Sequence, residues 1–127
     1  MPDGFVAPLA LSPDGRSLAL ASYTGAERPK AGQGGGVSFP RGWRVLRDGK
    51  QLGGVWPRVY GPFFNPRGDS VLFWGVSDKR TQTLIKDGVP VTDEYDAVSD
   101  TTTSHGGDRL IFAGIRNNVV YRVAIPW

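Results

Sequence analysis

The chain has 127 residues, of which 18 are Gly, 10 are Pro and 39% are hydrophobic, and its formal net charge is +3. This length suits one domain, and the aromatic residues, 11% of the chain, supply enough burial to exclude a disordered protein. The absence of cysteine excludes disulfides and thiolate zinc sites, no apolar run reaches the ~20 residues of a membrane helix, and residues 1–4 show no signal-peptide pattern.

Four short strands are expected in the first part of the chain, each bounded by residues that favour turns. They cover residues 7–11, 17–21, 43–47 and 51–55. The tetrapeptide SPDG at 12–15 predicts the first turn, and Asp48-Gly49 favours a type I′ hairpin turn because both central residues must take positive φ. The Gly-rich insert at about 26–39 has the composition of a loop.

The same order of strands recurs twice more. The second set covers 60–64, 70–74, 82–86 and 89–92, and the third covers 98–102, 109–113 and 119–125. Turn tetrapeptides NPRG at 65–68 and SHGG at 104–107 occupy the place of SPDG, and Asp87-Gly88 repeats the earlier hairpin turn. A helical period of 3.6 residues is not evident in the sequence.

Two independent markers give the length of the repeat. Gly49 and Gly88 are 39 residues apart, and so are Gly68 and Gly107. This period is close to the ~40–45 residues of a four-stranded propeller blade. The sequence therefore predicts an all-β fold, a single β-propeller segment over 1–127 built from three blades of four antiparallel strands. The expected repeats are about 5–56 with the insert, about 57–95 and about 96–127.

Residues 12–19 (SPDGRSLA) resemble the TolB-type, WD40-like propeller repeat, often called PD40. The segments WRVLRDGK at 43–50 and TLIKDG at 83–88 are similar to the version of this repeat that ends in an Asp-Gly hairpin. The tetrapeptides at 65–68 and 104–107 depart from the pattern. The resemblance, which covers nearly the whole chain apart from the insert, implies blades around a central axis that mediate protein contacts or cover a hydrolase domain, without a shared catalytic set. It leaves cytoplasmic and periplasmic locations both open.

Three blades are fewer than the ~4–8 of a closed propeller, and the third is expected to be incomplete. The interval from Gly68 to Asp87, applied to Gly107, places the next Asp-Gly turn at 126–127, where the sequence reads Pro-Trp. An open array leaves apolar faces and an unpaired strand edge. We expect a second copy to close a six-bladed ring. The alternatives are a different chain that supplies the missing parts, or a longer propeller of which this chain is the C-terminal piece.

Basic residues are scattered rather than gathered in the stripe that nucleic-acid binders use. The densest run, at 41–50, is interrupted by apolar residues, so a solvated strand edge is expected and nucleic acid is not a favoured partner. Arg28, Lys30 and Arg41 flank the Gly-rich insert and are the candidates for contact with an anion or a protein partner.

Two groupings resemble known catalytic or phosphate-binding patterns without satisfying them. Ser104, His105 and Asp108 fall within one turn, whereas a triad needs groups that converge in space, so a structural turn is expected. The run GQGGG at 32–36 lacks the Gly-Lys-Ser/Thr ending and the following helix of a phosphate loop. No cofactor or metal site is therefore predicted.

The acidic run around residue 95 has two interpretations. Asp93, Glu94 and Asp96 have the chemistry of an acid–base pair or of a cation site. Tyr95, however, stands one period after Trp56, and a periodic aromatic residue is usually a packing residue. A polar corner between blades, with the tyrosine packed inward, is the expected structure.

A non-catalytic scaffold or binding module that assembles with another copy is the expected function. Large aromatic side chains should fill the spaces between blades: Trp43, Phe73, Trp74, Phe112 and Tyr121. The rival is a propeller-type hydrolase or carbohydrate-active enzyme, in which two of the carboxylates Asp69, Asp100 and Asp108 would have to face each other ~5–9.5 Å apart. An isolated β-sandwich is a third possibility.

Overall fold

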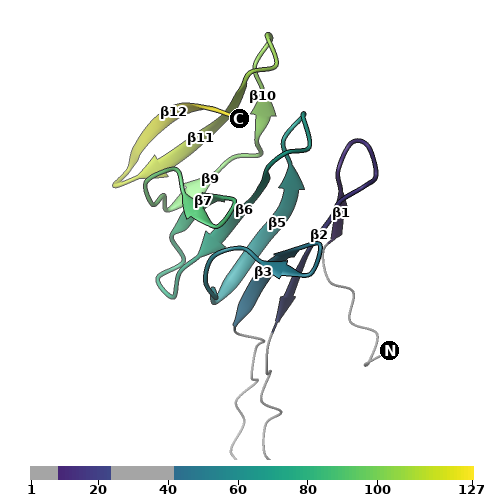
Figure 1. Cartoon of the computed structure of the whole chain (residues 1–127). Helices are drawn as coiled ribbons and strands as arrows, with labels where there is room; N and C mark the ends of the chain where they lie inside the picture. The colour runs from purple at the N-terminus through teal and green to yellow at the C-terminus, as the bar shows by residue number, and fades with distance from the viewer. Residues whose placement is uncertain (1–8, 24–41) are drawn as a thin grey trace, which may run out of the picture.

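A computed structural model describes residues 9–23 and 42–127 of the chain. In this part of the chain, twelve strands form three antiparallel sheets of four strands each (Figure 1). No helix of the described residues is long and apolar enough to cross a membrane. The prediction of an all-β fold made of four-stranded antiparallel sheets is therefore confirmed.

Sheets 1 and 2 share one strand order, in which each strand pairs with the next along the chain. Sheet 1 consists of β1 (Leu9–Leu11), β2 (Leu18–Tyr23), β3 (Trp43–Arg47) and β4 (Lys50–Gln51). Sheet 2 consists of β5 (Arg58–Phe64), β6 (Val71–Val76), β7 (Gln82–Lys86) and β8 (Val89–Pro90). The bounds of β3 and β7 match the sequence prediction, whereas the outer strands β4 and β8 are shorter than predicted.

Sheet 3 differs at both of its edges. It consists of β9 (Ala97–Val98), β10 (Thr102–Thr103), β11 (Arg109–Arg116) and β12 (Val119–Pro126). Both β9 and β10 pair with the same side of β11, so together they occupy the position that β1 or β5 holds alone. Among the described residues, no strand pairs with the other side of β12.

The β11–β12 hairpin also shifts the register by one residue. Its turn contains only Asn117 and Asn118, both with positive φ, whereas five residues join β6 to β7. As a result Ile125 lies opposite Leu110, at the position that Asp87 holds opposite Val71. The residues equivalent to Asp87 and Gly88 are therefore 125 and 126. They lie one residue before positions 126–127, where the sequence interval predicts the turn.

The three predicted turn tetrapeptides fold in the same way. The side-chain oxygens of Ser12, Asn65 and Ser104 each accept a hydrogen bond from the backbone N–H five residues later, at 3.0, 3.0 and 3.1 Å. The glycine at the end of each tetrapeptide has positive φ, between 73° and 79°. A side chain that satisfies a buried or half-buried backbone group stabilises such a turn.

The two Asp-Gly turns are hairpins of the predicted kind, since all four residues have positive φ. The carboxylate of Asp48 accepts a hydrogen bond from the backbone N–H of Leu18, and that of Asp87 accepts one from Val71, both at 2.9 Å. Each aspartate thus joins the end of the third strand of its sheet to the start of the second strand.

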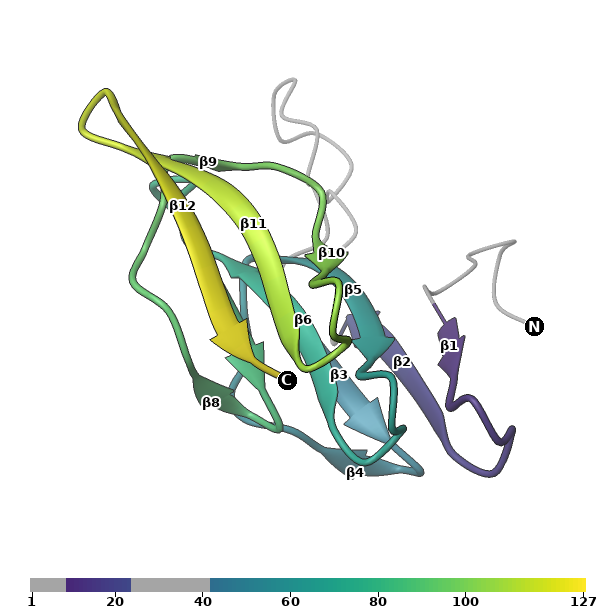
Figure 2. The ribbon, with the colours of Figure 1, turned by 90° about the horizontal axis from the view of Figure 1, so that it is seen from above.

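The sheets pack face to face, with sheet 2 between the other two (Figure 2). Val71, Phe73 and Ile85 of sheet 2 meet Ala19, Ala21 and Val45 of sheet 1 in one buried cluster. The opposite face of sheet 2, with Leu72, Trp74 and Leu84, meets Leu110 and Phe112 of sheet 3 in a second cluster. Every residue of β6 is buried, because both of its faces are covered.

Of the aromatic residues expected between the sheets, Phe73, Trp74 and Phe112 are buried and Trp43 is half-buried. The prediction was wrong for Tyr121, whose side chain remains 37% exposed, although its ring lies 6.2 Å from that of Tyr95. Tyr121 lies near the end of the β11–β12 hairpin, which extends beyond the strands of sheet 2 (Figure 2).

The same aromatic–glycine contact joins each sheet to the next. Trp56 exchanges two backbone hydrogen bonds with Trp43, at 2.8 and 2.7 Å, and its ring covers Gly75 of sheet 2. Tyr95 exchanges two with Gln82, at 2.8 and 2.9 Å, and its ring covers Gly114 of sheet 3. A Cβ at either glycine would come within 2.5 or 2.6 Å of the ring. Trp56 and Tyr95 thus hold equivalent places, as their spacing indicates.

We expect Gly75→Ala to lower the free energy of unfolding by about 1–3 kcal/mol, because the added methyl group overlaps the Trp56 ring and forces sheets 1 and 2 apart. Urea denaturation followed by tryptophan fluorescence measures the change. Gly54→Ala is the matched control, since a Cβ there meets no atom within 4 Å. Equal stabilities of the two variants would contradict the contact.

Candidate functional site

The residues predicted to contact an anion or a partner, Arg28, Lys30 and Arg41, lie outside the described residues, and so does the Gly-rich insert at 26–39. Among the described basic residues, Arg47 and Lys86 occupy equivalent positions at the ends of β3 and β7. Arg47 donates to the backbone carbonyls of Asp69 and Gly68 of sheet 2, at 2.9 and 3.3 Å. Lys86 donates to the carbonyl of Trp127, at 2.7 Å. Both cations therefore tie one sheet to the next.

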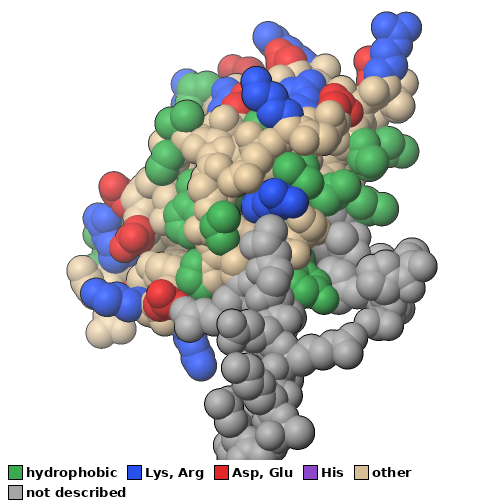
Figure 3. Space-filling view, turned by 60° about the horizontal axis from the view of Figure 1, so that its bottom comes forward, with side chains coloured by type: hydrophobic (Ala, Val, Ile, Leu, Met, Phe, Trp, Pro, Cys, Tyr) green, Lys and Arg blue, Asp and Glu red, His purple; other side chains and the backbone are tan. Residues whose placement is uncertain are grey.

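The described charges do not form one basic surface on the face seen in Figure 3. On the face seen in Figure 3, Lys and Arg side chains lie between acidic and hydrophobic ones rather than in a continuous stripe. Nucleic-acid binding needs a concentrated positive patch that follows the phosphate backbone. The described part of the chain offers no such patch on this face.

Ser104, His105 and Asp108 lie within the β10–β11 turn. The hydroxyl of Ser104 donates to the carboxylate of Asp108 at 3.1 Å and accepts from the backbone N–H of Arg109. In the β5–β6 turn, Asn65 similarly donates to Asp69 and accepts from Ser70. The same contacts recur where no histidine is present, which supports a role in the turn.

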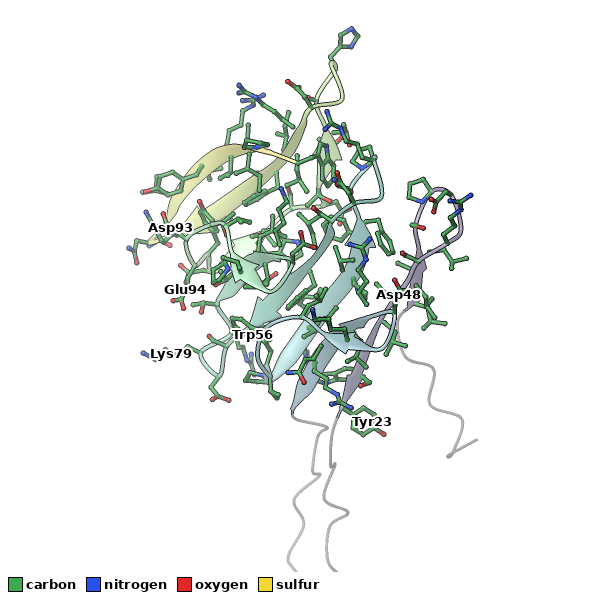
Figure 4. The ribbon with its side chains drawn as sticks, viewed as in Figure 1. Tyr23, Asp48, Trp56, Lys79, Asp93 and Glu94 are labelled. Atoms are coloured by element: carbon green, nitrogen blue, oxygen red, sulfur yellow. The ribbon has the colours of Figure 1, made fainter. Side chains whose placement is uncertain are left out.

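Asp93, Glu94 and Asp96 form the corner between sheets 2 and 3. Asp93 makes an ion pair with Arg116 at 3.3 Å, and Asp96 accepts a hydrogen bond from the backbone N–H of Asn117 at 3.1 Å. Figure 4 shows Asp93 and Glu94 beside each other on one side of the molecule, with Asp48 on the other side. The described residues contain no group of three His, Cys, Asp or Glu side chains that could hold a metal ion.

Two of the grooves between sheets 2 and 3 contain the candidate carboxylates. Asp69 and Asp108 both line the first, of about 410 Å³, at the turns that precede β6 and β11. Asp100 lines the second, of about 450 Å³, with Tyr60 and Phe63 of β5. The structure therefore brings two of the three candidate carboxylates to one groove and leaves the third in another.

Hydrogen bonds lower the pKa of three aspartates in the turns. The pKa of Asp14 is lowered chiefly by the Ser12 hydroxyl and that of Asp69 by the Asn65 amide. The pKa of Asp48 is lowered chiefly by the backbone N–H of Leu18. Each of these carboxylates is stabilised in its charged form by a structural contact, which accounts for the shift without an active site.

The free face of sheet 1 is a leucine surface. In β2, Ala19 and Ala21 point toward sheet 2, so the alternate residues point the other way. Register places the leucines of β1 and β3 beside them. This leucine face consists of Leu9, Leu11, Leu18, Leu20 and Leu46. Leu9 and Leu11 are 61% and 65% exposed, and no described residue of another sheet covers the face.

The free face of sheet 3 is also apolar but carries smaller side chains. In β11, Leu110 and Phe112 point toward sheet 2, and the alternate residues point away. Register adds the neighbouring residues of β12. This aliphatic face consists of Ile111, Ala113, Ile115, Val120 and Ala124, and it also carries Arg109 and Arg122. Val120 is 68% exposed.

The leucine face and the aliphatic face are equivalent to the two kinds of sheet face that pack against each other within the described residues. Leu18 and Leu20 hold the positions in sheet 1 that Val71 and Phe73 hold in sheet 2, and those residues pack against the preceding sheet. Ile111 and Ala113 hold the positions of Leu72 and Trp74, which pack against the following sheet. The described residues thus leave one face of each type without a neighbouring sheet.

A scan against models of known protein families matches none of them, and searches of curated proteins and of solved structures find no match either. The two free faces are the strongest candidates for a functional site, because they expose large apolar side chains such as Leu9, Leu11 and Val120. The repeat pattern of the sequence predicts open ends but does not identify these residues. The alternation of leucine and alanine at 18–21 is the signal that distinguishes the two faces of β2.

Asp48→Asn should reduce the melting temperature, with the largest difference from the unchanged protein above about pH 5. The carboxylate stabilises the fold above its unfolded pKa of about 3.8 and loses this effect as pH falls through its lowered folded value. The two proteins should therefore converge near pH 2 in thermal melts followed by circular dichroism. Asp100→Asn, at an exposed position between β9 and β10, is the control. A difference that is constant from pH 2 to pH 7 would refute the charged contact.

Proposed function

We propose that this chain is a non-catalytic scaffold of the β-propeller type, in which two copies join head to tail into a ring of six four-stranded sheets. Six units fall within the ~4–8 of closed propellers. In this assembly the leucine face of each copy packs against the aliphatic face of the other.

The observation that carries the proposal is the relation between the two free faces. Inside the chain, the face that holds Leu72 and Trp74 packs against the face that holds Leu110 and Phe112. The aliphatic face is equivalent to the face with Leu72 and Trp74, and the leucine face is equivalent to the face with Leu110 and Phe112. The two free faces lie at opposite ends of the chain. A second copy offers each face the kind of surface that covers its equivalents.

Symmetry favours head-to-tail over face-to-face pairing. A dimer that pairs leucine face with leucine face leaves both aliphatic faces exposed to water. A head-to-tail pair covers all four faces, provided that the rotation between copies closes the ring. Full burial of a leucine side chain contributes about 1.5–3 kcal/mol, so exposed residues such as Leu9 and Leu11 supply a substantial driving force.

The polar residues support binding rather than catalysis. Ser104 and Asp108 contact each other within a turn, and Asp93 is paired with Arg116. Asp69, which lines a groove with Asp108, is held by Asn65. These groups are engaged in structural contacts among the described residues, and the exposed surface that remains is mainly apolar at the two ends.

Light scattering at low micromolar concentration should give a mass twice the 13.7 kDa of the chain. Leu9→Glu should raise the dimer dissociation constant by about 100-fold or more, because it places an unpaired carboxylate in the apolar interface. Val89→Glu is the matched control. Val89 is also 61% exposed, but it lies on β8 of the middle sheet. A monomer at all accessible concentrations, or equal effects of the two variants, would overturn the proposal.

A charge-swap experiment tests the head-to-tail arrangement itself. Leu9→Lys and Val120→Glu should each weaken self-association, whereas an equimolar mixture should recover the dimer mass. In the mixed dimer one interface is unchanged and the other joins opposite charges, while face-to-face pairing offers no such combination. No recovery on mixing would contradict the head-to-tail arrangement.

A further inference from the structure

The groove that Asp100 lines, between sheets 2 and 3, has the size of a site for a small ligand. Its volume of about 450 Å³ lies within the ~300–1,000 Å³ of small-molecule pockets. The residues around it lie between positions 60 and 101, in the middle of the chain. None of them belongs to the leucine face or the aliphatic face. The lining of the groove is therefore independent of whether those two faces are covered.

Three aromatic side chains line the groove from sheet 2. In β5, Val59 packs toward sheet 1, so Tyr60 points toward sheet 3. The register shift between Tyr60 and Phe63 turns Phe63 to the same side, where it packs with the cluster shared with sheet 3. Trp74 lies directly opposite Tyr60 in the β5–β6 pairing. The Tyr60 side chain remains 47% exposed, so a ligand in the groove can reach its ring.

From sheet 3, Asp100 lines the groove on the short segment that separates β9 from β10. Ser99 fixes the backbone of this segment. Its hydroxyl accepts a hydrogen bond from the backbone N–H of Ala113 at 2.8 Å and donates one to the carbonyl of Asp100 at 3.0 Å. The carboxylate of Asp100 is thus carried by a backbone that is bonded to β11.

The charge of the lining favours a cationic ligand. Asp100 is the only charged residue among those that line the groove, and no basic side chain of the described residues pairs with it. By contrast, Asp93 at the nearby corner is paired with Arg116. Arg58, the only basic residue of β5, begins that strand and does not line the groove. An unpaired carboxylate and the negative faces of aromatic rings both attract a cation.

A metal ion does not fit this lining, because a calcium ion takes about 6–8 oxygen ligands and a single carboxylate lines the groove. A cation with an apolar body makes use of both kinds of group. Its alkyl groups contact the aromatic side chains, while its charge lies near the carboxylate. Thr101 and Gln82 also line the groove, and their side chains have no hydrogen-bond partner among the described residues.

We infer that this groove binds an organic cation with an alkylated ammonium group. The rings of Tyr60, Phe63 and Trp74 receive the alkyl groups, and Asp100 supplies the countercharge. The hydroxyl of Thr101 and the amide of Gln82 are placed to bond to a polar group of the same ligand.

The probe is choline, titrated into the isotope-labelled full chain and followed by nuclear magnetic resonance. We expect saturable shifts of the amide signals of Tyr60, Asp100 and Thr101. The matched ligand is 3,3-dimethyl-1-butanol, in which a carbon atom replaces the nitrogen of choline. This neutral molecule should bind about tenfold more weakly or worse, because it has the shape of choline without its charge. Equal affinities for the two molecules, or no saturable shifts with choline, would overturn the inference.

Two variants locate the site. Asp100→Asn removes the charge and Tyr60→Leu removes the exposed ring, and each should raise the dissociation constant of choline about tenfold or more. Asp108→Asn, in the other groove, and Tyr121→Leu, at an exposed tyrosine of β12, are the matched controls. If Tyr60→Leu is poorly folded by circular dichroism, Asp100→Asn decides, since its side chain is exposed. An unchanged dissociation constant for Asp100→Asn would refute the site.

A short peptide that carries trimethyllysine distinguishes the two sources of such a cation. Tighter binding of the peptide than of choline would assign the groove to a protein segment, and tighter binding of choline would assign it to a free small molecule. Either result supports the site if Asp100→Asn weakens the binding. Light scattering judges the ring separately, because a monomer that binds choline would overturn the ring proposal and leave the cation site intact.

Discussion

The structure depends on covering sheets that carry apolar side chains on both of their faces. In a strand, successive side chains point to opposite sides, so a sheet with apolar residues at every position must be packed from two directions. β6 meets this condition fully, since all six of its residues are buried between the neighbouring sheets. Sheets 1 and 3 are covered on one face only within the described residues, and their other faces hold leucine or smaller aliphatic side chains. The proposed assembly follows from this imbalance.

Polar contacts fix the turns and the positions of the strands whose apolar side chains pack between the sheets. Each turn before a second strand is closed by a Ser or Asn side chain, and in sheets 1 and 2 an aspartate joins the second strand to the third. Arg47 extends this network from sheet 1 to sheet 2. Ser104 and Asp108, two of the residues that resemble a catalytic triad, likewise contact each other within a turn.

Much of the fold could be predicted because turns and alternation are local. Spacing predicts β3, β7 and the Asp-Gly hairpins. It also predicts that Trp56 and Tyr95 hold equivalent positions in their units. Other features depend on tertiary context. The two-residue turn at Asn117 and Asn118 shifts β12 by one position, which an interval measured on sheet 2 cannot reveal. The leucine face depends on which side of β2 packs against sheet 2, and the sequence alone does not determine that side. The candidate residues Arg28, Lys30 and Arg41 remain predictions, because they lie outside the described residues.

The aromatic–glycine contacts have a consequence for how such a chain can change in length. Each contact takes its aromatic residue from one unit and its glycine from the next, Trp56 with Gly75 and Tyr95 with Gly114. Loss of one whole unit would bring the aromatic residue of the unit before it onto the glycine of the unit after it, and duplication of a unit would add one complete contact. Gene rearrangements in steps of whole units therefore preserve these contacts, whereas a deletion that removes only the aromatic residue or only the glycine leaves its partner without a contact.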